Sequence, residues 1–130
     1  MPPRLRRRLG VGLIRLVGLA LLATAAVKVT PHPAVAERMA SRGITRPVLL
    51  GLVEAGCVAA LLVPRTRRVG LLLCTAYLGG AIHATVTGGV VKALPAVLLQ
   101  ALLWTGAALA TPDLLGPLLG RRDQEEPADA

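Results

Sequence analysis

The chain has 130 residues, of which 54% are hydrophobic, with one Trp, one Tyr, no Phe and a mean hydropathy of +0.64. A soluble core of this size normally contains more aromatic residues and fewer long aliphatic runs, so the composition argues against a soluble globular domain. The formal charge of +8 does not indicate a nucleic-acid partner, because the basic residues fall between apolar runs and are not interleaved with aromatic residues. We therefore expect the lipid bilayer to be the main partner.

The first apolar run covers residues 10–29 and follows a basic N-terminus at residues 1–9. About 20 apolar residues cross the hydrocarbon core of a bilayer, so this run predicts a membrane-spanning helix. A basic start, an apolar stretch and the small residues 23–26 are also typical of a secretory signal peptide. The later apolar runs favour an uncleaved first helix, because they already describe a multi-pass protein.

Residues 30–46 form the longest polar connection, and their apolar and charged residues are spaced as in a short helix on the membrane surface. Three further spans are predicted at residues 47–63, 69–87 and 90–110. The membrane domain would thus cover residues 10–111, followed by an interfacial segment and a disordered tail at residues 112–130. The predicted fold class is an all-α integral membrane four-helix bundle.

The basic residues also predict the orientation of this bundle. With the N-terminus inside, nine of them lie at cytoplasmic ends: Arg4, Arg6, Arg7, Arg8, Arg65, Arg67, Arg68, Arg121 and Arg122. Five lie at outer ends: Lys28, Arg38, Arg42, Arg46 and Lys92. Because cytoplasmic loops carry an excess of Lys and Arg, we expect both termini in the cytoplasm.

Ionisable residues inside the predicted spans are the first candidates for a functional site. Glu54 and His83 lie in the second and third spans, where insertion scales assign a charged side chain a cost of roughly 2.5–3.5 kcal/mol. At 1.5 Å per residue, Glu54 and Gln100 lie about 10 Å below the outer surface and His83 about 6 Å below it. Lys28 closes the outer end of the first helix, and Tyr77 can add a hydrogen bond between helices. We therefore predict one polar network in the outer half of the bundle.

Small residues recur every four positions beside this predicted network. They are Gly51, Ala55 and Ala59 in the second span, and Ala76, Gly80 and Ala84 in the third. Small residues at this spacing let membrane helices approach closely. We expect these ridges to bring Glu54 and His83 together.

Two interpretations of the polar network stay open. In the first, it forms a pocket open to the outer face, with Glu54 as base or counter-ion and His83 as its titrating partner. In the second, Glu54 pairs with Lys28 or His83 only to fix the register of the helices. Buried polar groups need partners in both cases, so pairing alone does not separate the two.

Several chemistries lack the residues that they require. The chain has no phosphate-binding loop, no zinc-ligand spacing and no haem-attachment motif, and its only serine, Ser41, lies in the polar connection. Hydrolysis and a metal site are therefore not expected, and enzymatic activity is left open. Cys57 and Cys74 lie in separate spans without a CxxC motif, so we interpret them as small buried hydrophobic residues, with a redox pair as the alternative.

A resemblance to a known family is carried by residues 54–89, EAGCVAALLVPRTRRVGLLLCTAYLGGAIHATVTGG. This stretch resembles the signature region of the DoxX-like family of small bacterial membrane proteins, with a Glu in the second helix, a Pro-Arg-Thr-Arg-Arg turn, and a Gly-Gly-Ala segment followed by a His in the third. The likeness extends over roughly residues 10–110. It implies a multi-pass, four-helix protein of the bacterial inner membrane, with Lys28, Glu54 and His83 at the characteristic polar positions of the family.

The resemblance also implies a leading hypothesis for function. Under it, the chain is an accessory subunit of a redox or quinone-linked membrane system, with a redox protein as partner and quinone as the implied cofactor. The alternative is a non-enzymatic assembly factor or chaperone that recognises transmembrane helices of another protein. A small transporter ranks third, because the two halves of the sequence show no repeat.

Overall fold

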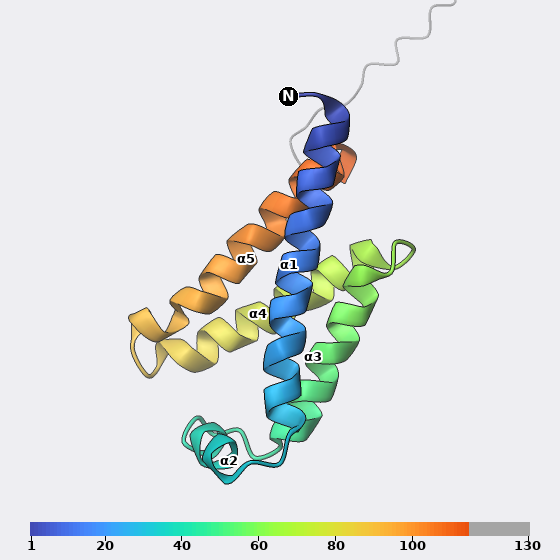
Figure 1. The fold of residues 1–130 in the computed structure, drawn as a ribbon. Coiled ribbons are helices and arrows are strands. Elements are labelled where there is room, and N and C mark those ends of the chain that lie inside the picture. The colour runs from blue at the N-terminus through green and yellow to red at the C-terminus, as the bar shows by residue number, and fades with distance from the viewer. Residues whose placement is uncertain (115–130) are drawn as a thin grey trace, which may run out of the picture.

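The computed structural model describes residues 1–114, and within them all the secondary-structure elements are helices joined by short connections (Figure 1). The elements are α1 (Pro3–Val29), α2 (Pro33–Ala40), α3 (Pro47–Leu62), α4 (Arg67–Val86), α5 (Val90–Ala110) and the short 3-10 helix η1 (Pro112–Leu114). The predicted all-α class is confirmed. Three helices, α1, α4 and α5, are long and apolar enough to cross a membrane, whereas α3 has 16 residues.

The clearest difference from the predicted elements lies at the N-terminus. α1 begins at Pro3, within the stretch that we expected to be a separate basic segment. Proline suits the first turn of a helix and arginine is a strong helix former, so the basic residues extend the helix by about two turns. The interfacial segment and tail predicted after residue 111 lie outside the described residues, apart from η1.

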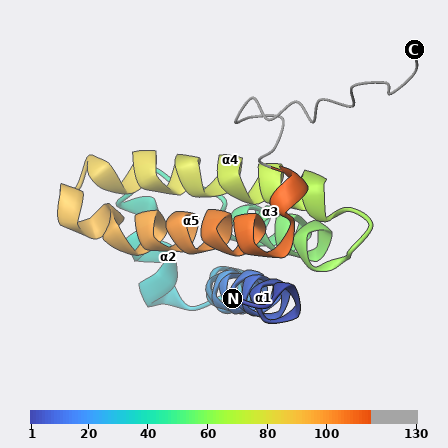
Figure 2. The same cartoon turned by 90° about the horizontal axis from the view of Figure 1, so that it is seen from above.

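The four long helices pack in a ring in which α1 and α4 each pack against both α3 and α5. α1 runs from the N-terminus at the top of Figure 1 to α2 at the bottom, and α3 runs back upward. In Figure 2 α1 is seen almost end-on while α4 and α5 lie lengthwise, so these two helices cross α1 steeply. The α4–α5 turn and α2 lie toward the same end of the molecule.

Two glycines allow the closest helix contacts. A Cβ atom at Gly10 of α1 would lie 2.3 Å from the backbone nitrogen of Ala110, and one at Gly70 of α4 would lie 2.2 Å from that of Leu61. Any side chain there would overlap the neighbouring backbone. Around these contacts, buried aliphatic residues and both cysteines fill the centre of the ring, including Val17, Val58, Leu61, Cys74 and Leu103.

The predicted small-residue ridges do not form one interface between α3 and α4. Gly51 lies against α1, where a Cβ would be 3.0 Å from the carbonyl oxygen of Ala25. Ala55 is half-buried and Ala59 is exposed. Ala76, Gly80 and Ala84 line a cavity, and a Cβ at Gly80 would meet no atom within 4 Å. The small residues of α4 therefore leave space open instead of closing a helix contact.

Candidate binding site beside Lys28

The carboxylate of Glu54 is the centre of a polar network between α1 and α3. Glu54 lies on the inner face of α3 with only 1% of its surface exposed. It accepts hydrogen bonds from Lys28 Nζ at 2.6 Å and from Thr24 Oγ1 at 2.5 Å. Thr24 and Lys28 are four residues apart on α1, so both face the same side of that helix. The carboxylate is thus paired with a cation and with a neutral donor.

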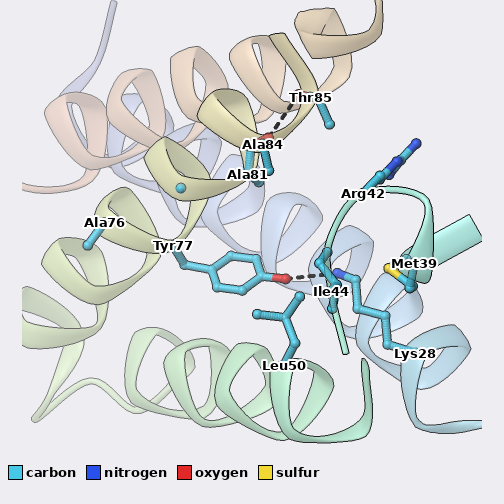
Figure 3. A pocket seen from close by; sticks show the side chains of 11 residues that line it. Lys28, Met39, Arg42, Ile44, Leu50, Ala76, Tyr77, Ala81, Ala84 and Thr85 are labelled. Atoms are coloured by element: carbon cyan, nitrogen blue, oxygen red, sulfur yellow. Dashed lines mark hydrogen bonds between the residues drawn. The ribbon is translucent and has the colours of Figure 1, made fainter. Parts of the chain in front are cut away.

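The ammonium group of Lys28 connects this pair to a third helix. Its Nζ donates to the Tyr77 hydroxyl oxygen on α4 at 2.8 Å and lies 5.4 Å from the centre of the Tyr77 ring (Figure 3). The Lys28 side chain is 14% exposed. One ammonium group therefore ties α1, α3 and α4 together.

The same contacts leave one hydrogen-bond donor available. An ammonium group has three N–H donors and no acceptor, and Lys28 uses two of them, on Glu54 and Tyr77. Because Lys28 can only donate, the Tyr77 oxygen is the acceptor in their hydrogen bond. The third N–H of Lys28 is therefore available to a ligand, whereas the hydroxyl hydrogen of Tyr77 lies within reach of the Glu54 carboxylate.

A cavity of about 380 Å³ lies beside these groups. Figure 3 shows its walls, which come from the end of α1, the end of α2 and the segment after it, the start of α3 and one face of α4. Met39, Ile44 and Leu50 line one side, and small residues of α4 line another. A mostly apolar cavity with a few convergent polar groups is typical of small-molecule sites, and its volume falls within their usual range.

Two residues of the predicted network lie elsewhere. His83 is exposed and makes no side-chain hydrogen bond within the described residues, so the structure does not bring it to Glu54. It follows Tyr77 by six positions, which at 3.6 residues per turn turns it about 120° away around α4. Gln100 is half-buried on α5, where its Oε1 atom has no hydrogen-bond partner among residues 1–114, and it does not line the cavity.

Sequence reasoning missed two parts of this site. Thr24 was considered only as one of the small residues of a signal peptide, although its four-residue spacing from Lys28 places both on one helix face. The second part is the segment after α2, which brings Arg42 and Ile44 to the cavity. No pattern in the sequence indicates that this connection folds back onto α4.

Other groups stay outside the site. Cys57 and Cys74 are both buried as free thiols and belong to the apolar core. Within the described part of the chain, no cluster of three or more His, Cys, Asp or Glu side chains could hold a metal ion. What the site can do chemically is therefore to offer a donor to an acceptor on an apolar molecule.

Comparison with protein-family models, curated proteins and solved structures finds no match to this chain.

Proposed function

We propose that the chain is a multi-pass membrane protein of the DoxX-like type that holds the ring of a quinone in the cavity beside Lys28. In this proposal it serves as an accessory subunit of a redox or quinone-linked system in the bacterial inner membrane. The observation that carries the proposal is the unused N–H of Lys28, beside the Tyr77 hydroxyl, at the wall of an apolar cavity.

The chemistry of a quinone matches this donor. A quinone presents carbonyl acceptors on an otherwise apolar ring, and it carries no charge. Glu54 already neutralises the Lys28 ammonium, so this part of the cavity favours a neutral acceptor over an anion. The ring would lie between Leu50 and Ile44 on one side and the small residues of α4 on the other, with one carbonyl oxygen facing Lys28 and Tyr77.

The proposed topology has four spans with both termini in the cytoplasm. It is supported by the length of α1, α4 and α5 and by the distribution of basic residues. Sixteen residues of α3 extend about 24 Å, somewhat less than a hydrocarbon core of roughly 30 Å. Local thinning of the bilayer accommodates such a mismatch at modest cost. Under this topology the cavity opens near the outer face.

A pair of glycine variants tests the proposed ligand. Gly79 and Gly80 are neighbours on α4, both are exposed, and a Cβ at either would meet no atom within 4 Å, but only Gly80 lines the cavity. We expect Gly80→Leu to fill the cavity and weaken binding of a short-chain benzoquinone to the detergent-solubilised protein by about tenfold, a difference of about 1.4 kcal/mol. Gly79→Leu should bind like the wild type.

Equal binding by both variants and the wild type would place the quinone elsewhere. If the wild-type protein binds no quinone and instead copurifies with an unrelated membrane protein, the assembly-factor hypothesis becomes the better one.

A further inference from the structure

A second hollow, distinct from the quinone cavity, lies where α2 approaches the α4–α5 turn. It has a volume of about 440 Å³, and its charged side chains are Arg38, Arg42 and Lys92. Lys92 folds back over the turn, because a Cβ placed at Gly88 would lie 3.6 Å from its Nζ. Three cations from two separate parts of the chain thus converge on one hollow.

These three cations are not neutralised by the described part of the chain. The ion pair between Lys28 and Glu54 is the only one within residues 1–114, and no acidic residue lines the hollow. Glu37 is adjacent to Arg38 in sequence but forms no ion pair with it. The hollow therefore combines three positive charges with no negative one.

The neutral hydroxyl groups of the hollow are already used. Ser41 donates to the carbonyl oxygen of Arg38 at 2.8 Å, and Thr87 donates to that of Ala84 at 3.1 Å. Thr85 likewise donates to its own helix. The donors that remain for a ligand are therefore the guanidinium groups of Arg38 and Arg42 and the ammonium of Lys92. Donors that are all cationic select an anion over a neutral molecule.

We propose that this hollow binds the phosphate group of an anionic phospholipid. The planar guanidinium groups of Arg38 and Arg42 can each donate two hydrogen bonds to phosphate oxygens. Basic residues at a membrane surface attract the headgroups of anionic lipids. The surroundings favour a lipid over free phosphate. Val90 and Val91, which directly precede Lys92, are 72% and 77% exposed, and Leu94 is half exposed, so acyl chains have an apolar surface beside the headgroup.

This inference does not depend on quinone binding. The hollow and the cavity share Arg42, Ala84 and Thr85, but Lys28, which is paired with Glu54, lines only the cavity, and Arg38 and Lys92 line only the hollow. The two sites thus select different ligands, a neutral acceptor in one and an anion in the other. Arg42, which lines both, would be held in place at the cavity wall by a bound phosphate.

The test compares two triple variants of the full chain in mild detergent. Arg38→Gln/Arg42→Gln/Lys92→Gln removes the three cations of the hollow. Arg6→Gln/Arg65→Gln/Arg68→Gln removes the same charge from exposed arginines at the N-terminus and the α3–α4 turn, away from the hollow. Binding is measured by titration with fluorescently labelled phosphatidylglycerol and phosphatidylcholine. Helix content by circular dichroism shows that both variants are folded.

We expect the wild type and the control variant to prefer phosphatidylglycerol, and the hollow variant to lose this preference by about tenfold or more, since each basic residue near the lipid contributes severalfold. Equal losses in both variants would show a general effect of net charge and overturn the proposal. Retained preference in the hollow variant would do the same. Displacement of the lipid by millimolar inorganic phosphate would identify a free-anion site and not a lipid site.

Discussion

Lys28 lies near the end of the long apolar helix α1, and its positive charge offsets the cost of burying the Glu54 carboxylate. An isolated carboxylate in a low-dielectric interior is costly, and pairing with a hydrogen-bonded cation offsets much of that cost. The pair at 2.6 Å, supported by Thr24, provides this compensation. The same ammonium donates to Tyr77, so the residue that satisfies the carboxylate also holds the Tyr77 hydroxyl at the cavity wall.

The first prediction concerns the free energy of unfolding across this pair. Glu54→Met and Lys28→Met alone should each destabilise the protein by about 3–5 kcal/mol, because each leaves an unpaired charge. The double variant should lose clearly less unfolding free energy than the sum of the two single losses, since it removes both charges. The measurement is SDS-induced unfolding in detergent micelles.

His83→Ala is the control for that cycle. His83 is exposed and outside the network, so its replacement should change stability by no more than about 0.5 kcal/mol. Strictly additive losses at Lys28 and Glu54, or a large loss at His83, would contradict the pairing described here.

A second prediction separates binding from stability at Tyr77. Tyr77→Phe keeps the ring and removes the hydroxyl that accepts a hydrogen bond from Lys28 at the wall of the cavity. We expect benzoquinone affinity to fall by about tenfold, or about 1.4 kcal/mol, by equilibrium titration. The unfolding free energy should fall by only about 1 kcal/mol, the usual net contribution of one hydrogen bond. Unchanged affinity would remove Tyr77 from the site.

At the level of the helices, α3 and α4 pack closely because Gly70 of α4 has no side chain. Gly70→Ala would place a methyl group on the backbone of Leu61, so the helices must shift apart. We expect a loss of about 2 kcal/mol or more in unfolding free energy, which is typical of overpacking.

Gly79→Ala is the matched control, because a Cβ there meets nothing and alanine favours the helix by up to about 1 kcal/mol. It should be neutral or stabilising. If both alanine variants behave alike, the close approach at Gly70 does not limit the packing of these helices.

The helices were largely predictable because apolar runs and their boundaries are local signals. Pro47 and the glycines at 88 and 89 bounded two of the runs, and α3, α4 and α5 follow within two residues of the expected ends. α1 begins at Pro3, ahead of the predicted span, because arginine continues a helix well.

For the candidate site, the sequence indicates how deep in the bundle each polar residue lies, but not which side of its helix that residue faces. The helical rise placed Lys28 and Glu54 in the same outer half of the bundle, and the structure brings them together. The same reasoning grouped His83 with them, but depth does not decide which side of α4 a residue faces. Likewise, the four-residue spacing of Ala76, Gly80 and Ala84 predicted a row of small residues. It did not show whether the space beside that row is filled by another helix or left open.

For the whole molecule, the ring of helices places α2 and the α3–α4 turn at opposite ends. The proposed topology puts α2 outside and the turn inside. An impermeant maleimide should therefore label Ala36→Cys in intact cells, and Arg65→Cys only after permeabilisation. Both positions are exposed, and the native cysteines are buried, so the wild type serves as the background. The reverse labelling pattern would invert the orientation.

The cavity beside Lys28 is lined by the Lys28 network and by segments from four parts of the chain, and in the proposed topology it opens near the outer face. A photoreactive benzoquinone analogue, irradiated with the reconstituted protein and located by peptide mass spectrometry, reports directly on what occupies it. We predict labelling within residues 76–85 of α4 or residues 39–50, suppressed by excess unlabelled quinone and by Gly80→Leu but not by Gly79→Leu. Labelling confined to α5 or to the N-terminal arginines, or labelling that unlabelled quinone does not suppress, would contradict a quinone site beside Lys28.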